Sequence, residues 1–464
     1  MDDEIRFLSW LEEELVRAAR TKAAPRRAVG WRLQPSALGF PHARAVGFGG
    51  VAVLVLLAWV IVLSSGLLTH GIALGQPPHR YAPVLPAPAP RGSLLSAVAA
   101  VSADDVWAVG TSYAGSNPSP RGISLHWDGT VWHAVPTPPV GGLVAVSAAA
   151  SGDVWAASGS SDSRGRALFL HWNGAGWRVV TGPPVPGAQI TSIVAVSATD
   201  VWAVGSHYGV HYQNSCGGRS VGYRPLIEHW DGRAWSVIAA PDLPVRESEL
   251  LSVAAIVPND VWAVGQWVTN EQKGCTPQGT QRSFGFVEHW DGVRWRMVPA
   301  PNPGTGNNAF IGVAVVATND VWLSGQFGPT KAGASEHPMF AHWGGSAWAL
   351  VPSAPLRQGR AQALSPVSVS GAGPADVWAV GGGGFASDPL VEHWDGQHWT
   401  IVSSVGGLGA LPWSVVAVSP SDAWLVGQYA TAITVTEDRQ KVVTTRFSPL
   451  IEHWDGRAWS MVSP

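Results

Sequence analysis

Residues 190–205 read ITSIVAVSATDVWAVG, and residues 225–241, after a variable insert, read PLIEHWDGRAWSVIAAP. This unit recurs seven times between Leu94 and the end of the chain. Each copy carries three tryptophans: the first lies two residues after an aspartate, the second directly after a histidine, and the third five residues after the second. They account for 21 of the 26 tryptophans in the chain. A fixed period of this length indicates a repeat architecture.

Each unit divides into four short strands. The first strand alternates β-branched residues with small ones, and a dipeptide that accepts positive φ in a hairpin turn separates the third strand from the fourth. That dipeptide is Asp-Gly in five units, Asn173-Gly174 in the second and Gly344-Gly345 in the fifth. Four antiparallel strands per unit, spaced 46 to 60 residues apart, are typical of propeller blades. The sequence therefore predicts an all-β, seven-bladed β-propeller of four-stranded antiparallel blades.

The predicted division of the chain has four parts: a cytoplasmic N-terminal segment (1–45), a transmembrane α-helix (46–68), a proline-rich stalk (69–93) and the propeller (94–464). The blades are expected at about 94–138, 139–184, 185–243, 244–303, 304–356, 357–406 and 407–464. Because the chain starts on a first strand and stops on a fourth, the ring is expected to close by packing alone.

The amino-acid composition excludes several classes of protein. A net charge of -3 with 13% charged residues leaves no strong field for nucleic acid. The 54 glycines and 36 prolines suit a turn-rich all-β protein, and 46% hydrophobic residues argue against disorder. Two cysteines are too few for a disulfide scaffold or a cysteine-based metal fold. No cofactor and no metal site are predicted.

The repeat resembles the propellers of the kelch and galactose-oxidase kind, and bacterial sensor propellers with tryptophan in the second strand. The resemblance covers Leu94 to Pro464 and concerns architecture. Kelch blades carry a Gly-Gly doublet after the second strand, where most blades here have a single glycine such as Gly205. This sequence does not match, motif by motif, the ligands of the copper radical site found in galactose-oxidase-like propellers. The resemblance therefore implies a fold and leaves the function open.

Residues 46–68 (VGFGGVAVLVLLAWVIVLSSGLL) contain no charge. As a helix they would be about 34 Å long, enough to cross a hydrocarbon core of roughly 30 Å. The alternative is a cleavable signal peptide, with Ala73-Leu74-Gly75 as a passable cleavage site. The length of the apolar run and the 45 residues before it favour an uncleaved single-pass anchor.

The flanks of this span predict its orientation. Residues 17–44 carry seven arginines and lysines and no acid, whereas residues 69–93 carry only Arg80 and Arg91. The positive-inside rule then leaves the N-terminus cytoplasmic and the propeller extracellular, in a cell membrane. Residues 3–20 have the apolar spacing of an amphipathic helix. This helix would dock a cytosolic partner or lie on the inner membrane surface.

The histidine before each third-strand tryptophan invites a metal or acid-base interpretation. However, a catalytic residue is needed once, whereas this histidine occurs in every blade. A half-buried imidazole needs a hydrogen-bond partner, and the aspartate that opens each second strand is the obvious candidate. The sequence predicts a structural network of aspartate, histidine and tryptophan, represented in blades three and four by Asp200, His229, Trp230, Asp260, His289 and Trp290.

Function is expected where the repeats differ. The interval between second- and third-strand tryptophans runs from 16 residues in blade six to 30 in blade seven, and this connection opens on the face where propellers usually bind ligands. Aromatic and arginine residues among Gly and Ser are typical of recognition surfaces. The candidate ligand-binding residues in these inserts are Tyr113, Tyr208, Tyr212, Arg219, Tyr223, Arg224, Trp267, Arg282, Phe327 and Tyr429.

The sequence therefore predicts a module that binds an extracellular glycan, peptide or protein. The alternative is an extracellular glycan-active hydrolase or lyase, which would need two or three carboxylates converging on the insert face. The inserts supply one or two acids per blade, never recurrent, so no catalytic residue is predicted.

The two cysteines lie near the middle of the long inserts of neighbouring blades three and four. Both inserts should project from the same face into an oxidising compartment, where a close thiol pair is expected to oxidise. We therefore expect a disulfide between Cys216 and Cys275. The alternative is two unrelated thiols.

Overall fold

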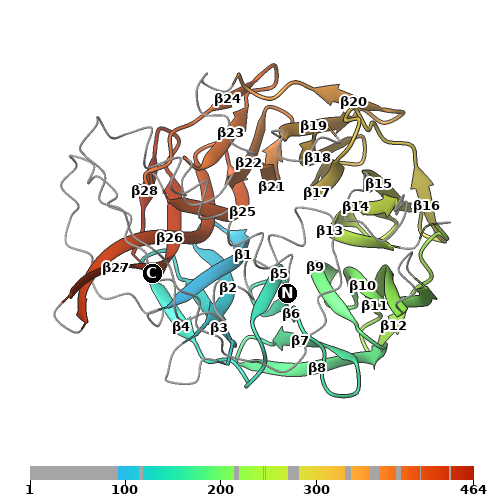
Figure 1. Cartoon of the computed structure of the whole chain (residues 1–464), viewed down its shortest axis with the longest axis horizontal. Helices are drawn as coiled ribbons and strands as arrows, with labels where there is room; N and C mark the ends of the chain where they lie inside the picture. The colour runs from blue at the N-terminus through green and yellow to red at the C-terminus, as the bar shows by residue number, and fades with distance from the viewer. Residues whose placement is uncertain are drawn as a thin grey trace, which may run out of the picture.

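The computed structural model describes residues 92–113, 119–213, 219–243, 245, 247–269, 282–329, 336–355, 365–382, 388–407, 409–437 and 440–463. These residues form seven four-stranded antiparallel sheets arranged around a central axis (Figure 1). The chain is thus an all-β, seven-bladed β-propeller, which confirms the predicted fold class. The predicted transmembrane helix at 46–68 lies outside the described residues. Within the described ones, no helix is long and apolar enough to span a membrane.

The first three blades are built from twelve strands. Blade 1 contains β1 (Ser93–Ser102), β2 (Asp105–Ser112), β3 (Arg121–Trp127) and β4 (Trp132–Val135). Blade 2 contains β5 (Leu143–Ala150), β6 (Asp153–Ser158), β7 (Arg166–Trp172) and β8 (Trp177–Pro184). Blade 3 contains β9 (Gln189–Ser197), β10 (Asp200–Gln213), β11 (Arg219–Trp230) and β12 (Trp235–Val237).

The remaining four blades repeat this order. Blade 4 contains β13 (Glu247–Val257), β14 (Asp260–Thr269), β15 (Arg282–Trp290) and β16 (Trp295–Val298). Blade 5 contains β17 (Asn308–Ala317), β18 (Asp320–Phe327), β19 (His337–Trp343) and β20 (Trp348–Val351). Blade 6 contains β21 (Ser365–Gly373), β22 (Asp376–Gly382), β23 (Leu390–Trp394) and β24 (Trp399–Ile401). Blade 7 contains β25 (Ala410–Ser419), β26 (Asp422–Glu437), β27 (Gln440–Trp454) and β28 (Trp459–Met461).

The turn between third and fourth strands follows from its residue types. In blade 3, Asp231 Oδ1 accepts hydrogen bonds from the backbone amides of Arg233 and Ala234 at 2.8 and 2.9 Å. Gly232 has a φ of 90°, a conformation that costs glycine little and other residues more. The aspartate thus replaces backbone partners that the tight turn leaves unsatisfied.

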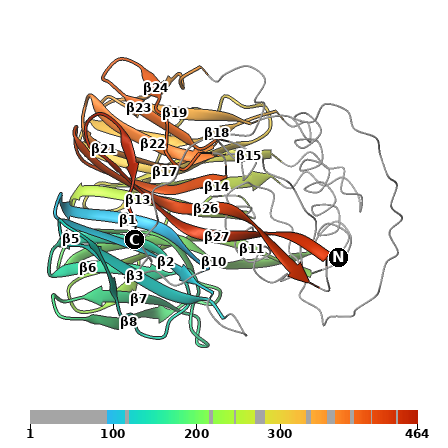
Figure 2. The ribbon, with the colours of Figure 1, turned by 90° about the vertical axis from the view of Figure 1, so that its left-hand side faces the viewer.

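Antiparallel pairing sorts the connections onto two faces of the ring. The first-to-second and third-to-fourth turns share what we call the turn face. The second-to-third connections and the linkers between blades share the opposite one, which we call the insert face. Figure 2 shows β26 and β27 extending well beyond the ring on the side of the insert face. The hairpin remains paired out to Glu437 and Gln440, so the longest insert is largely a continuation of its blade.

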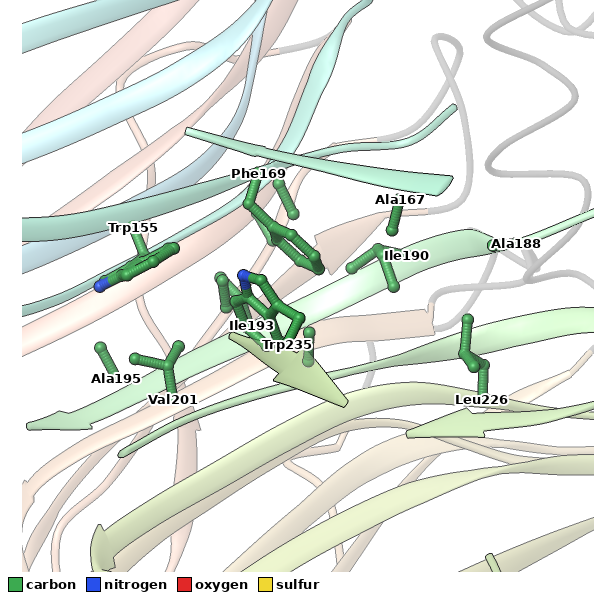
Figure 3. Packing of buried hydrophobic residues seen from close by; sticks show 13 residues of the cluster. Trp155, Ala167, Phe169, Ala188, Ile190, Ile193, Ala195, Val201, Leu226 and Trp235 are labelled. Carbon is green, nitrogen blue, oxygen red and sulfur yellow. The ribbon is translucent and has the colours of Figure 1, made fainter. Parts of the chain in front are cut away.

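Tryptophans form the joints between blades. The buried Trp155 of β6 contacts Trp230 and Trp235 of blade 3, with ring centroids 5.2 and 5.6 Å apart. Phe169 stacks on Trp235 at 4.0 Å, and this cluster continues through Ile190 (Figure 3). The same triad recurs at the other joints: Trp107 with Trp172 and Trp177, Trp202 with Trp290 and Trp295, Trp262 with Trp343 and Trp348, Trp322 with Trp394 and Trp399, and Trp378 with Trp454 and Trp459.

The seventh triad closes the ring. Trp424 of blade 7 lies 5.0 Å from Trp127 and 5.4 Å from Trp132 of blade 1. Both blades are complete four-stranded sheets, and neither lends a strand to the other. In addition to packing, the backbone amide of Val98 donates a hydrogen bond to Ser414 Oγ at 3.2 Å. Closure by packing alone was therefore an incomplete expectation, because the inner strands also bond across the joint.

Candidate functional site

On the turn face, each blade carries one histidine bound to one aspartate. In blade 3, His229 Nε2 donates to Asp200 Oδ1 at 2.7 Å, and in blade 4 His289 does so to Asp260 at 2.8 Å. The other five blades repeat the pair at 2.7 to 2.9 Å. Seven equal pairs, each inside its own blade, have the geometry of a repeated structural bond.

The tryptophan that joins each pair is the one in the second strand. The ring of His229 lies 4.2 Å from that of Trp202, and His289 stacks on Trp262 at 4.2 Å. The predicted members Trp230 and Trp290 lie outside this network and pack on the second-strand tryptophan of the preceding blade. The difference arises because neighbouring side chains in a strand point to opposite faces.

A second recurrent acid lies just before the histidine of β11, β15, β23 and β27 and is fully buried. Glu452 accepts hydrogen bonds from Ser404 Oγ at 2.7 Å and from the Gly406 amide at 2.8 Å, and thereby fixes the linker that enters blade 7. Glu392 binds Ser353 and Ala354 in the same way. These acids hold linkers.

Glu228 and Glu288 occupy the same place without such partners. The residue that corresponds to Ser404, five after the fourth-strand tryptophan, is Gly182 in front of Glu228 and Ala240 in front of Glu288. Neither carboxyl has a hydrogen-bond partner in the part of the chain that the structure describes. Burial raises the pKa of both to about 8, so both are protonated at neutral pH.

On the insert face, blade 3 presents an aromatic pair. Tyr208 of β10 and Tyr223 of β11 are cross-strand partners, and their rings meet edge to face at 5.7 Å. The ring of Tyr208 lies directly over Gly187, where a Cβ would be 2.4 Å from it. Tyr208 is nevertheless 49% exposed. It therefore combines a fixed position with a large accessible ring, as a recognition residue requires.

Two predicted binding residues instead have structural contacts. Arg224 Nη1 donates to the carbonyl of Leu243 at 2.6 Å and so ties β11 to the linker that enters blade 4. Trp267 stacks on Phe284 at 4.4 Å and packs against the core between blades 3 and 4. Both side chains contribute to the joint between these blades.

The other candidates are dispersed over the ring. Tyr113 is half-buried, and burial raises its pKa to about 12. Tyr429 packs against the core between blades 6 and 7, and Arg282 is exposed at the start of β15. Phe327 lies 5.4 Å from His337 and lines an apolar groove of about 420 Å³ on blade 5.

Four candidates cannot be placed in the same way. Tyr212 and Arg219 belong to β10 and β11 by their backbones, near the end of the hairpin, where Tyr212 pairs with Ser220 and Gln213 with Arg219. Cys216 and Cys275 lie outside the described residues. The disulfide between them stays a prediction.

The sequence analysis missed a polar group beside the tyrosines. Glu247 and Glu249 open β13 of blade 4, and both are buried. Gln266 Nε2 donates to Glu249 Oε1 at 2.9 Å. The signal was an acid where the first strands of blades 1, 5 and 7 have Leu94, Ala309 and Leu411. Both acids lie on a first strand, outside the second-to-third inserts in which the blades differ most in length.

The pKa of Tyr223 depends on its surroundings. Burial raises the pKa of Tyr223 most, and the charges of Tyr208, Glu247 and Glu249 raise it further. Burial also raises the pKa of Glu249; the Gln266 hydrogen bond opposes this and the Glu247 charge adds to it. The strands that carry these residues, β11 and β13, are in contact across the joint between blades 3 and 4.

Among the described residues, no group of three or more histidines, cysteines, aspartates or glutamates is placed to hold a metal ion. His207 lies beside Arg224 in the register of β10 and β11. Burial lowers the pKa of His207, and the charge of Arg224 lowers it further.

No family model and no curated protein matches the chain. Among solved structures, the β-propeller domain of the Trilobed protease from Pyrococcus furiosus is similar over 81% of this chain and 99% of that one, with 10% identity and a TM-score of 0.46. YCF48 bound to D1 peptide matches over 80% and 98%, with 15% identity and a TM-score of 0.44. The fucose-specific lectin from Aleuria aurantia matches over 69% and 94%, with 14% identity and a TM-score of 0.40.

Proposed function

We propose that this propeller is a recognition module that binds a glycan, peptide or protein through its insert face. The observation that carries the proposal is that the turn face is the same in every blade whereas the insert face differs between blades. The turn face repeats one bonded histidine-aspartate pair in every blade. The insert face is where the blades differ, and there the half-exposed Tyr208 is fixed over Gly187 next to Tyr223.

We also propose that the module is displayed outside the cell by an uncleaved N-terminal anchor at 46–68. The support is the uncharged length of this span and the excess of arginine and lysine before it. Protease added to intact cells should then degrade the propeller and spare the residues before Val46. A protected propeller would contradict the topology without touching the binding proposal.

Binding is tested by presenting the full-length protein, kept in a mild detergent, to glycan and peptide arrays. A variant in which the blade-3 connection 206–225 is replaced by the shorter blade-2 connection 159–165 serves as comparison. This variant keeps all the strand tryptophans and the β10–β11 pairs from Val201 to Gly205, so it should fold, although it loses the Arg224 bond to Leu243. We expect it to lose the ligand that the natural chain binds. Equal binding by both proteins would remove blade 3 from the proposed surface.

A further inference from the structure

Arginines lie on the insert face at the third strands of four consecutive blades. Arg121 is the first residue of β3 in blade 1, and Arg164 lies two residues before β7 in blade 2. Arg224 lies in β11 of blade 3, and Arg282 is the first residue of β15 in blade 4. Figure 1 shows these strands following one another around one side of the ring. We call the four residues the arginine arc.

Each member of the arc lies where its blade is bonded to the linker that enters the next blade. One hydrogen bond of 2.6 to 3.1 Å marks each of the four joints: Gly122 N to Val140 O, Val185 N to Gly165 O, Arg224 Nη1 to Leu243 O, and Ser283 N to Gly306 O. Packed sheets lie about 10 Å apart, so neighbouring members are separated by roughly that distance or more. The arc therefore suits an extended ligand better than a compact one.

Three members of the arc have free charges. Arg121, Arg164 and Arg282 are exposed, and none has an ion-pair partner in the part of the chain that the structure describes. The loop that carries Arg164 is held in place by Asp162, which accepts its amide at 2.9 Å and pairs with the Arg166 guanidinium at 2.7 Å. Free guanidinium groups bind carboxylates through two parallel hydrogen bonds.

The acids on this side of the ring leave the arc uncompensated. At the joint between blades 3 and 4, Glu247 and Glu249 are buried. Asp242 is fully exposed, and the side chain closest to it in the arc is Arg224, at 4.0 Å. The aspartates of the histidine pairs and of the Asp-Gly turns all lie on the opposite, turn face. The insert side of blades 1 to 4 therefore attracts an anion.

An aromatic ring accompanies one of the free arginines. Tyr208 donates its backbone amide to the Pro186 carbonyl at 3.0 Å, and its half-exposed ring lies over Gly187. The adjacent Val185 is bonded to Gly165, the residue after Arg164. The cation and the ring thus border the same short linker. A uronic acid combines a carboxylate with a flat ring face in each unit, whereas an acidic amino acid has a carboxylate and no ring.

From these observations we propose that the arginine arc and Tyr208 bind an acidic polysaccharide, with uronate carboxylates on Arg121, Arg164 and Arg282 and one sugar ring against Tyr208. This inference rests on the proposed recognition function and specifies its ligand class. Charge and extended shape come from the polysaccharide chain, and the arc supplies a complementary charge at successive joints.

The first test is arginine modification by phenylglyoxal in the full-length protein, kept in mild detergent and mapped by mass spectrometry. Oligomers of galacturonic acid or of alginate should protect Arg121, Arg164 and Arg282. They should leave Arg294 reactive, because this exposed arginine of blade 4 lies on the turn face. Methyl-esterified galacturonate oligomers, which keep the rings and lose the charge, should protect none. Absence of protection by both acidic oligomers would overturn the proposal.

The second test is the affinity of arginine variants for the protecting oligomer. Arg164→Gln and Arg282→Gln should each weaken binding about five-fold. Together they should weaken it about twenty-five-fold, because they lie at different joints and act independently. Tyr208→Ala should weaken it about thirty-fold. All of these side chains reach solvent, so the melting temperatures should stay unchanged.

Arg294→Gln is the matched control, because it removes the same charge from the other face of the blade that carries Arg282. It should leave the affinity unchanged. Equal losses in Arg282→Gln and Arg294→Gln would mean general attraction between the protein and a polyanion, and would overturn the proposal.

Three further outcomes separate this inference from the proposed function. A capped oligo-glutamate peptide that binds as tightly, with the same losses in the variants, would replace the polysaccharide by an acidic peptide. If an array ligand depends on Tyr208 but the acidic oligomers do not bind, the arginine arc is wrong and the recognition module stands. If neither arrays nor acidic oligomers give binding, both proposals fail.

Discussion

At the scale of single residues, the recurrent third-strand glutamate has different hydrogen-bond partners in different blades. The buried glutamate of the third strand is satisfied in blades 6 and 7, where Ser353 and Ser404 donate to it. In blades 3 and 4 it has no such donor and stays protonated. Burial raises the pKa of all four glutamates, and hydrogen bonds from the linker serine and backbone amides oppose this rise in blades 6 and 7.

The unpaired acids make the stability of the propeller pH-dependent. The pKa of Glu288 is about 8 in the folded chain and near 4.5 when unfolded, so the folded state retains a proton that the unfolded state loses. The contribution of Glu288 to the free energy of unfolding is constant below about pH 4.5, falls as the pH rises from there to about 8, and is constant again above pH 8. The loss is on the order of 5 kcal/mol per group. Glu288→Gln should therefore raise the melting temperature at pH 8 and leave it nearly unchanged at pH 4.

Ala240→Ser provides the converse check, because it offers Glu288 the hydroxyl that Ser404 gives Glu452. It should lower the pKa of Glu288 and stabilise the chain at pH 8. Equal pH dependence of unfolding in all three proteins would show that Glu288 is not protonated in the folded state.

The histidines of the turn face have a structural role in this account. His393→Ala removes the partner of Asp376, which is almost fully buried, and removes a ring stacked near Trp378. We expect a loss of about 2 kcal/mol in the free energy of unfolding, measured by chemical denaturation. A variant of full stability would mean that this bond does not support the blade.

At the scale of elements, the turns and strands of each blade could be predicted because their signals are local. Asp-Gly fixes the third-to-fourth turn, and alternation fixes the strands. The long inserts of blades 3 and 7 are extended hairpins, β10–β11 and β26–β27, which the sequence analysis had treated as loops. Their regular pairing could not be foreseen, because tyrosine- and threonine-rich segments suit a surface loop as well as an exposed β-ribbon.

We propose that one covalent link joins the inserts of blades 3 and 4. Cys216 belongs to the blade-3 insert and Cys275 to the blade-4 insert, so a disulfide would hold the two together and lower the ordering cost of binding. Closing a loop of about 60 residues could stabilise the chain by roughly 4 kcal/mol. Labelling of the native protein with a thiol reagent should find no reactive cysteine until a reductant is added. Two labelled thiols per chain before reduction would rule the bond out.

At the scale of the whole molecule, 21 tryptophans have one explanation. Each second-strand tryptophan packs on two tryptophans of the next blade, so every joint has the same triad. The number of blades followed from counting repeats. Which neighbouring blade each tryptophan contacts could not be predicted, because spacing in the sequence does not tell which neighbour a side chain faces. The same holds for Glu247 and Glu249, because their strand β13 contacts β11, the strand of Tyr223, only across the joint between blades 3 and 4.

The closing joint should be equivalent to the others. Trp424→Ala removes the contacts between blades 7 and 1, and Trp202→Ala removes those between blades 3 and 4. Each should cost about 3 to 5 kcal/mol, the usual loss for a buried large aromatic residue. Denaturant titration of the two variants gives the comparison. A much smaller loss for Trp424→Ala would mean that the ring is not held closed at this point.

We infer that repeated residues maintain the fold and that unrepeated residues on the insert face bind the ligand. The most direct test is the affinity, per folded molecule, of the His229→Ala and Tyr208→Ala variants for the best ligand from the arrays. We predict that His229→Ala binds like the natural chain, although it unfolds more easily. Tyr208→Ala should retain its melting temperature and bind about thirty-fold more weakly, as expected for a central aromatic contact. Lost binding in His229→Ala together with unchanged binding in Tyr208→Ala would contradict the claim and place the site on the turn face.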